Sequence, residues 1–150
     1  MKSVKNNSEL EQLYNVSHQI LGGFMKQLKV IVAGSRDLTG SHNFINWNLD
    51  YLLQHYEPQD VLIISGGARG VDKCGEVYAK RNDIKCKVFP ADWNKHGKRA
   101  GYIRNEQMAD NANALIAFWN GHSRGTKHMI DIAKARDINT KVIISPSVNM

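Results

Sequence analysis

Five short apolar runs alternate with helical segments, and this alternation constrains the fold more than any other feature of the chain. The runs are Lys29–Ala33, Asp60–Ile64, Lys85–Phe89, Ala114–Phe118 and Lys141–Ile144. Each is nearly continuous in hydrophobicity and bounded by turn residues, a pattern typical of strands covered on both faces of a parallel sheet. The alternating order with right-handed crossovers predicts an α/β fold, a Rossmann-like three-layer αβα domain with a parallel sheet of about five strands.

The segments between these runs carry helical patterns. Helices are expected near Ser41–Tyr56, Val71–Arg81, Arg99–Ala109 and Thr126–Arg136. In the first of them, the apolar residues Phe44, Trp47, Tyr51 and Leu52 recur with helical spacing. These four side chains therefore predict the apolar face of that helix.

Residues 1–27 are expected to form an N-terminal helical extension to the Rossmann-like domain, which spans 28–150. Ser8 with Glu11 three residues later matches a capping box, and Gly22 with Gly23 ends the helical pattern. Apolar residues lie near one helical face at Leu10, Leu13, Ile20, Leu21 and Phe24, with Ser17 as an interruption. This stripe would pack across the sheet or meet a second subunit, so the expected partners include a second copy in a homo-oligomer.

Length and composition are those of an ordinary soluble protein. The chain has 150 residues, enough for one domain, and no apolar run long enough to span a membrane. Its N-terminus does not resemble a signal peptide, and its two cysteines, Cys74 and Cys86, suit a reducing compartment. A cytoplasmic location is therefore expected. The six histidines are scattered without metal-ligand spacing, so neither a metal nor a cofactor is expected.

The positive charge of the chain is concentrated in one segment. The formal net charge is +6. The segment from Lys95 to Lys127 contains six basic residues and only two acidic ones. Such an excess attracts anions and raises their encounter rate. It does not distinguish a mononucleotide from a polynucleotide or an acidic protein, and a solvated basic surface gives the same pattern.

Polar and glycine-rich loops follow the predicted strands at the edge where ligands of open parallel sheets bind. The first loop carries Gly34, Ser35 and Arg36, and the second carries Gly66, Gly67, Ala68, Arg69 and Gly70. Glycine lets backbone N–H groups approach a phosphate at a helix start, and arginine adds bidentate contacts. Asp72, which follows the second loop, has two interpretations: a helix residue favoured by the dipole, or a group that holds a ribose hydroxyl.

Two further loops add an aromatic side chain that could stack on a base and a second turn that could bind an anion. Asp92 and Trp93 follow the third strand, and Trp93 either stacks on a base or packs under the loop. Arg104 and Asn105 lie on the helix after that loop. After the fourth strand, Ser123, Gly125 and Thr126 form a phosphate-sized turn at a helix start. Together, the phosphate, base and ribose contacts of these loops predict a nucleotide or nucleotide-derived ligand, and the residues named in this paragraph and the one before it are expected to bind it.

As a set, these motifs resemble the SLOG superfamily, and specifically its YspA-like members. The matching residues are Gly34-Ser35-Arg36, Gly66 to Asp72, Pro90-Ala91-Asp92-Trp93, Gly97, Ala100-Gly101, Arg104-Asn105, Met108, Ser123 and Gly125-Thr126. The resemblance covers roughly Leu28 to Ile144 and implies a Rossmann-like fold related to the LOG phosphoribohydrolases and to the DNA-processing protein DprA. It also implies that the chain senses or processes a nucleotide-derived ligand, as such proteins do in conflicts between bacteria and phages.

The chain departs from the LOG pattern at the catalytic position. LOG hydrolases place a glutamate two or three residues after the threonine of their second glycine-rich turn, where this chain has His128 and Met129. Asp72 and Glu106 are the candidates that would replace this carboxylate.

Three functions are therefore compatible with the sequence. The first is a sensor or sponge that binds a nucleotide signal, with Arg36, Arg69 and Arg104 on phosphate, Trp93 on the base and Asp72 on ribose. The second is a nucleotide phosphoribohydrolase or N-glycosidase. The third is a DprA-like binder of single-stranded nucleic acid, favoured by the basic segment.

Overall fold

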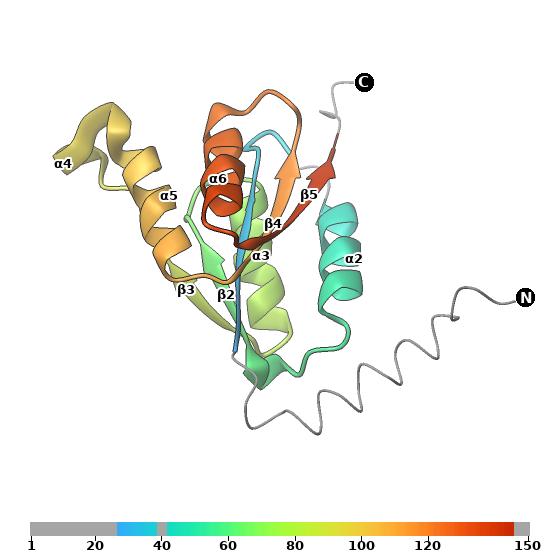
Figure 1. The fold of residues 1–150 in the computed structure, drawn as a ribbon. Helices are drawn as coiled ribbons and strands as arrows, with labels where there is room; N and C mark the ends of the chain where they lie inside the picture. The colour runs from blue at the N-terminus through green and yellow to red at the C-terminus, as the bar shows by residue number, and fades with distance from the viewer. Residues whose placement is uncertain (1–26, 39–41, 146–150) are drawn as a thin grey trace, which may run out of the picture.

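The five predicted strands form one parallel sheet. The computed structural model describes residues 27–38 and 42–145, so the predicted extension over 1–27 lies outside the described residues except for its last position. The strands are β1 (Leu28–Gly34), β2 (Val61–Ser65), β3 (Lys85–Val88), β4 (Ala114–Trp119) and β5 (Asn139–Ile144). Their order in the sheet is β3-β2-β1-β4-β5, and every neighbouring pair is parallel. The predicted Rossmann-like α/β fold is confirmed (Figure 1).

The strand order reverses beside the central strand. The chain passes from β1 outward to β2 and β3, and then crosses to the other side of β1 to form β4 and β5. Connections from β1 and β4 therefore leave in opposite directions, and this divergence opens a crevice at the carboxyl ends of the two strands. The register pairs Gly34 with Phe118 at that edge.

Helices cover both faces of the sheet. They are α2 (His42–Leu53), α3 (Val71–Arg81), the short α4 (Trp93–His96), α5 (Ala100–Asp110) and α6 (Arg124–Ala135), with 3-10 turns at Pro58–Asp60 and Gly97–Arg99. One buried cluster joins α2 and α3 to the sheet through side chains such as Val30 and Ile63, and a second joins α5 and α6 through Ile31 and Ile64. Neighbouring residues of one strand thus serve opposite cores, as the pleat requires.

The predicted apolar face of α2 is wrong. Trp47 and Tyr51 are 64% and 58% exposed, Phe44 is also largely exposed, and the buried side chains of this helix are Ile45, Leu49 and Leu53. Of the predicted face, Leu52 packs partly against the core, and the Phe44 ring meets the buried Phe118 ring edge to face, with centroids 6.1 Å apart. The helix carries two apolar stripes, and the direction from which it crosses the sheet decides which one is buried.

The expectation that all five strands are covered on both faces is also wrong at the sheet edges. Every residue of β3 is exposed, and β5 is exposed or half-buried along its length. Only β1, β2 and β4 are largely buried, because the crossover helices lie over the middle of the sheet. Lys85 and Lys87 place charge on the outer strand, which discourages pairing with another sheet edge.

Candidate functional site: a basic cavity at the carboxyl edge of the sheet

A cavity of about 740 Å³ opens at the carboxyl ends of β1 and β4, where the strand order reverses. Residues from three of the four predicted loops and from the middle of α5 line it. The predicted residues in the lining are Gly34, Ser35, Arg36, Ala68, Arg69, Asp72, Arg104, Asn105, Ser123, Gly125 and Thr126. The structure therefore brings into one cavity side chains that lie up to 92 positions apart, from Gly34 to Thr126.

The floor of the cavity depends on Gly34. A Cβ atom at this position would lie 2.5 Å from the carbonyl oxygen of Phe118 and 2.6 Å from Cγ2 of Val71. Only glycine lets the end of β1 approach both β4 and the start of α3 so closely. The next residue, Ser35, donates its N–H to the same Phe118 oxygen (3.1 Å), and its hydroxyl accepts from the N–H of Asn120 (3.2 Å).

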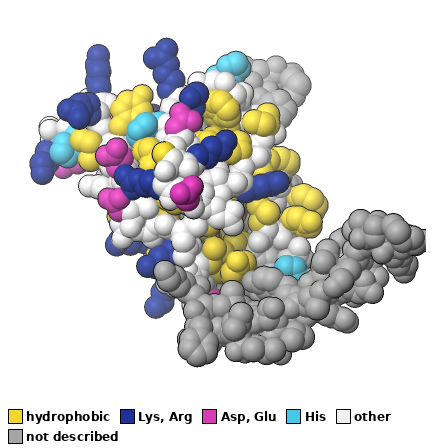
Figure 2. All heavy atoms as spheres, viewed as in Figure 1, with side chains coloured by type: hydrophobic (Ala, Val, Ile, Leu, Met, Phe, Trp, Pro, Cys, Tyr) yellow, Lys and Arg dark blue, Asp and Glu magenta, His cyan; other side chains and the backbone are white. Residues whose placement is uncertain are grey.

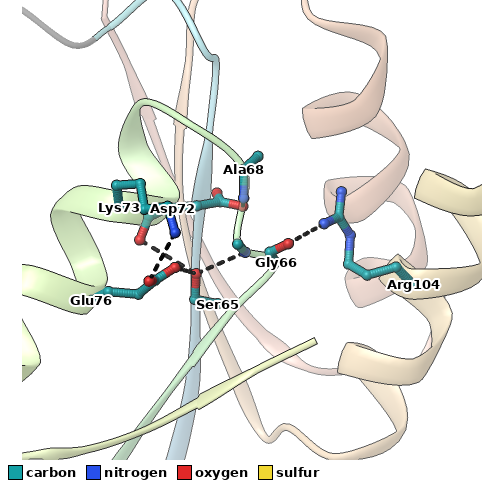
Figure 3. Close-up of polar contacts among 8 residues, drawn as sticks. Ser65, Gly66, Ala68, Asp72, Lys73, Glu76 and Arg104 are labelled. Atoms are coloured by element: carbon teal, nitrogen blue, oxygen red, sulfur yellow. Dashed lines mark hydrogen bonds and ion pairs between the residues drawn. The ribbon is translucent and has the colours of Figure 1, made fainter. Parts of the chain in front are cut away.

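The loop between β2 and α3 is held by a compact polar network (Figure 3). The buried Ser65 hydroxyl donates to Oε2 of Glu76 (2.6 Å) and accepts from the N–H of Gly67 (3.1 Å). The N–H of Ala68 donates to Oδ2 of Asp72 (3.1 Å). These bonds fix the turn that leads into α3.

All three predicted glycines of this loop lie outside the cavity lining. Gly70 has φ +85°, and a Cβ there would lie 2.8 Å from the carbonyl oxygen of Arg36. The carbonyl oxygen of Gly66 accepts a hydrogen bond from the Arg104 guanidinium, and a Cβ on Gly66 would overlap that side chain. Gly67, with φ +72°, also lies in the turn outside the lining. The glycines let neighbouring segments meet, while Ala68 and Arg69 face the cavity.

Asp72 is a buried carboxyl group in the cavity wall. It is 6% exposed, and its burial raises the pKa from 3.8 to about 6, against the lowering effects of the Ala68 N–H bond and the Arg104 charge. Glu76 adds a further raising effect on the pKa, and Arg36 a lowering one. The cavity thus contains a carboxyl group whose protonation changes near neutral pH.

Arg104 and Asn105 connect α5 to both glycine-rich turns. Arg104 donates to the Gly66 oxygen and, through Nε, to Oδ1 of Asn105 (3.1 Å). The buried Asn105 amide donates to the Gly125 oxygen (3.2 Å) and lies 3.1 Å from Nδ1 of His128. Burial lowers the pKa of Arg104 from its usual value, while Asp72 raises it. Arg104 is thus both a cation of the cavity wall and a structural bridge.

His128, at the position where LOG hydrolases carry glutamate, faces this bridge instead of the cavity. Its ring lies against the ring of Tyr102, with centroids 4.4 Å apart. Burial lowers the pKa of His128, although Glu106 and Asp131 raise it. The next residue, Met129, does line the cavity, but it carries no acid or base.

The start of α6 forms the opposite wall. Ser123 caps the helix by accepting the N–H of Thr126 (3.3 Å), and the two hydroxyls lie 3.0 Å apart. Asn120 Oδ1 accepts the N–H groups of His122 (2.8 Å) and Ser123 (2.9 Å), and the Asn120 amide donates to both carboxylate oxygens of Asp37 (3.2 Å each). This cap starts α6 at Arg124, two residues earlier than predicted.

The predicted ligand residues Asp92 and Trp93 lie outside the cavity lining. Asp92 caps α4 by accepting the N–H of Lys95 (3.0 Å), and Trp93 is 52% exposed on this helix. The Trp93 ring lies against Gly101, where a Cβ would be 3.6 Å from Cη2 of the indole. The catalytic candidate Glu106 is exposed on α5 and is also absent from the lining.

Several lining residues were not among the predicted ligand-binding residues, although Met108 is one of the residues that resemble the SLOG family. They are Ala33, Asp37, Met108, Asn120, His122 and Met129. Asn120 had a usable signal, since an asparagine two or three residues before a cap often binds the following N–H groups. Met129 had none, because its position in the lining follows from how α6 packs.

Exposed basic side chains gather around α4 and the 3-10 turn that follows it. Figure 2 shows Lys and Arg gathered on the side of the molecule where Figure 1 places α4. Lys95, Lys98 and Arg99 are exposed there and form no ion pair with the residues that the structure describes. Within 27–38 and 42–145, no three potential metal ligands cluster. In the same ranges, no helix is long and apolar enough to cross a membrane.

Fold and site together define a Rossmann-like domain with an arginine-lined cavity at the switch point of its sheet. The sequence model of the YspA, cpYpsA-related SLOG family matches residues 28–96. The gene 61 protein of Mycobacterium phage D29 is 31% identical over 116 residues, which cover 73% of this chain and 91% of that protein. The chain belongs to this SLOG family, as the sequence motifs predicted.

Two solved structures share the fold. DprA of Streptococcus pneumoniae superposes with a TM-score of 0.64 at 17% identity, over 83% of this chain and 52% of that one. DprA of Helicobacter pylori, solved for its single-stranded DNA binding mode, gives a TM-score of 0.61 at 18% identity, over 83% and 68%. This chain therefore spans about half the length of the first protein. At such identities the likeness concerns the fold alone.

Proposed function

We propose that this chain binds a nucleotide or a nucleotide-derived ligand in the cavity and acts as a sensor or sponge for it. The observation that carries the proposal is that three arginines, Arg36, Arg69 and Arg104, line one cavity. The starts of α3 and α6 border the same cavity, and N–H groups at a helix start favour anions.

Two of the arginines are free to serve a ligand. The side chains of Arg36 and Arg69 are exposed and form no hydrogen bond or ion pair with any described residue. A structural arginine normally finds a carboxylate or carbonyl partner, as Arg104 does at Gly66. Unpaired arginines at the rim of a pocket are suited to binding phosphate oxygens in bidentate geometry.

Thermal unfolding with nucleoside monophosphates, ADP-ribose, NAD, cyclic nucleotides and short single-stranded DNA tests the proposal. A ligand at a hundredfold its dissociation constant stabilises by about 2.7 kcal/mol. For a domain of this size each kcal/mol raises the midpoint by about 2–4 °C. We expect one small nucleotide to raise the midpoint in the wild type, and Arg69→Ala to abolish the rise.

Arg81→Ala is the matched control for that substitution. Arg81 ends α3, the helix that follows the Arg69 loop, so the same charge is removed far from the cavity. Both variants should unfold near the wild-type midpoint without ligand, because both side chains are exposed. A ligand shift that survives Arg69→Ala, or that Arg81→Ala also abolishes, would contradict the assignment of the cavity.

A second candidate function is binding of single-stranded nucleic acid. The unpaired cations Lys95, Lys98 and Arg99 favour it, because they extend the basic surface from the cavity toward α4. The fold shared with a DNA-binding DprA is consistent with it. Such binding should weaken steeply with salt, since phosphate contacts release counterions. Oligonucleotide binding that is insensitive to salt would argue against this function.

A third candidate, cleavage of an N-glycosidic bond, needs a carboxyl group at the anomeric carbon. Asp72 favours it, since a pKa of about 6 suits a general acid or base. The second candidate, Glu106, does not line the cavity. Chromatography of the ligand mixture would detect a released base, and Asp72→Asn should stop that release. Release unaffected by Asp72→Asn would remove this carboxyl group from the mechanism.

A further inference from the structure

The Asp72 carboxylate has an oxygen without a partner, although it is buried in the cavity wall. Oδ2 accepts the N–H of Ala68, whereas Oδ1 forms no hydrogen bond with any residue that the structure describes. Only 6% of the residue is exposed. A buried carboxylate with unused acceptor capacity is costly, because water no longer solvates it. The cavity therefore presents an acceptor that a ligand can fill.

The neighbouring cations do not use this oxygen. Arg104 is not within ion-pair distance of Asp72, and its guanidinium is committed to the Gly66 oxygen. Both groups nevertheless face the same small space, since a Cβ on Gly66 would lie 2.5 Å from Nη1 of Arg104 and 2.9 Å from Oδ2 of Asp72. Arg36 also acts on Asp72 only through space. Carboxylate and guanidinium groups are thus presented to the cavity separately.

We propose that Oδ1 of Asp72 accepts a hydrogen bond from a ribose hydroxyl, so that the cavity selects ribonucleotides over nucleotides that lack these hydroxyls. This inference rests on the proposed function. A phosphate would be repelled by the carboxylate and would bind the arginines, whereas the sugar of the same molecule supplies neutral O–H donors. The 2′-hydroxyl is the group by which a protein distinguishes RNA from DNA at one site. A nucleotide within a DNA strand has no free hydroxyl for Asp72.

The test compares sugar forms of otherwise identical ligands by isothermal titration. Nucleoside 5′-monophosphates of each common base are measured as ribo, 2′-deoxy and 2′,3′-dideoxy forms with the wild type. We expect the base that binds best to lose affinity by about tenfold or more when both hydroxyls are removed, because a hydrogen bond to a charged group is lost. Asp72→Ala should bind the three sugar forms with similar affinity.

A second variant guards against loss of the loop structure. Asp72→Ala leaves the Ala68 N–H without its acceptor, whereas Asp72→Asn keeps an amide oxygen for it. Asp72→Asn should therefore unfold cooperatively and show a reduced preference for ribose. Asp137→Asn is the matched control, since Asp137 lies between α6 and β5, outside the cavity lining. This variant should keep the full wild-type preference.

The outcomes separate the inference from the proposed function. Equal wild-type affinity for the three sugar forms overturns the inference and leaves nucleotide binding intact. A ribose preference that persists in both Asp72 variants overturns it as well. If the Asp72 variants change the preference among bases and not among sugars, the carboxylate contacts the base, and the inference is again wrong. If no monophosphate binds and ADP-ribose, NAD and cyclic nucleotides also leave the unfolding midpoint unchanged, the proposed function falls together with the inference.

Discussion

Asp72 illustrates how single residues at this site trade stability for a role in the cavity. Its carboxyl group is buried without an ion pair, and only the Ala68 N–H bonds to it. By contrast, Glu76 on α3 accepts a hydrogen bond from Ser65 at the end of β2 and lies 3.4 Å from the Lys73 ammonium. Natural proteins break local rules of this kind mainly at functional sites. The pH dependence of stability should reveal the cost.

We expect Asp72 to make the folded state less stable as the pH rises from about 4 to about 6. Its folded pKa of about 6 exceeds 3.8, so the folded state holds a proton that the unfolded state has already released. The loss amounts to about 3 kcal/mol and is complete above pH 6. Asp72→Asn should remove this slope and raise the free energy of unfolding at pH 7. Urea denaturation across this pH range measures it.

Asp137→Asn again serves as the comparison, because it removes a carboxylate that is exposed. It should keep the wild-type slope between pH 4 and 6. If the wild type and Asp72→Asn lose stability in parallel over this range, Asp72 does not titrate as its burial implies.

At the scale of elements, α2 shows that a helix can offer two apolar stripes and bury only one. The aliphatic stripe of Ile45, Leu49 and Leu53 packs on the sheet, while the Trp47 and Tyr51 rings stack on each other outside, with centroids 5.8 Å apart. Aliphatic side chains four positions apart fit a twisted sheet surface closely. Trp47 and Tyr51 form an exposed aromatic stripe on this helix.

We expect Leu49→Ala to lower the free energy of unfolding by about 2–5 kcal/mol, because Leu49 is fully buried and the substitution leaves a cavity. Trp47→Ala should cost less than about 1 kcal/mol, since it removes an exposed ring and one stacking contact. Chemical denaturation of both variants measures the difference. A larger loss for Trp47→Ala than for Leu49→Ala would place the aromatic stripe in a buried interface.

At the scale of the whole molecule, the two halves of the sheet meet at the carboxyl end of β1. There β1 pairs with β4, α3 begins against the same strand end, and the cavity opens above them. Gly34 occupies the point of contact, so the packing of both halves and the shape of the cavity depend on one position. A side chain there would push against backbone atoms, which cannot rotate away.

Gly34→Ala should therefore destabilise the protein by about 1–3 kcal/mol or more, the usual cost of overpacking. Gly125→Ala is the matched control, because nothing lies within 4 Å of a Cβ at that position and it sits in the first turn of α6. The control should leave stability unchanged or raise it slightly, since alanine favours helices. Equal midpoints for both variants in thermal unfolding would show that the strand ends are less tightly packed than described.

The sequence alone determined the order of elements, the fold class and most of the cavity lining. Hydrophobic periodicity and turn residues are local properties. Because parallel strands bring the loops after them to one edge, the sequence predicts that Arg36, Arg69 and Ser123 lie at the same edge of the sheet. Tertiary structure decided which stripe of α2 is buried, that Trp93 and Glu106 stay outside the cavity, and that Met108 and Met129 enter it. These features depend on how helices cross the sheet. That geometry arises from packing between segments far apart in the chain, which no local pattern records.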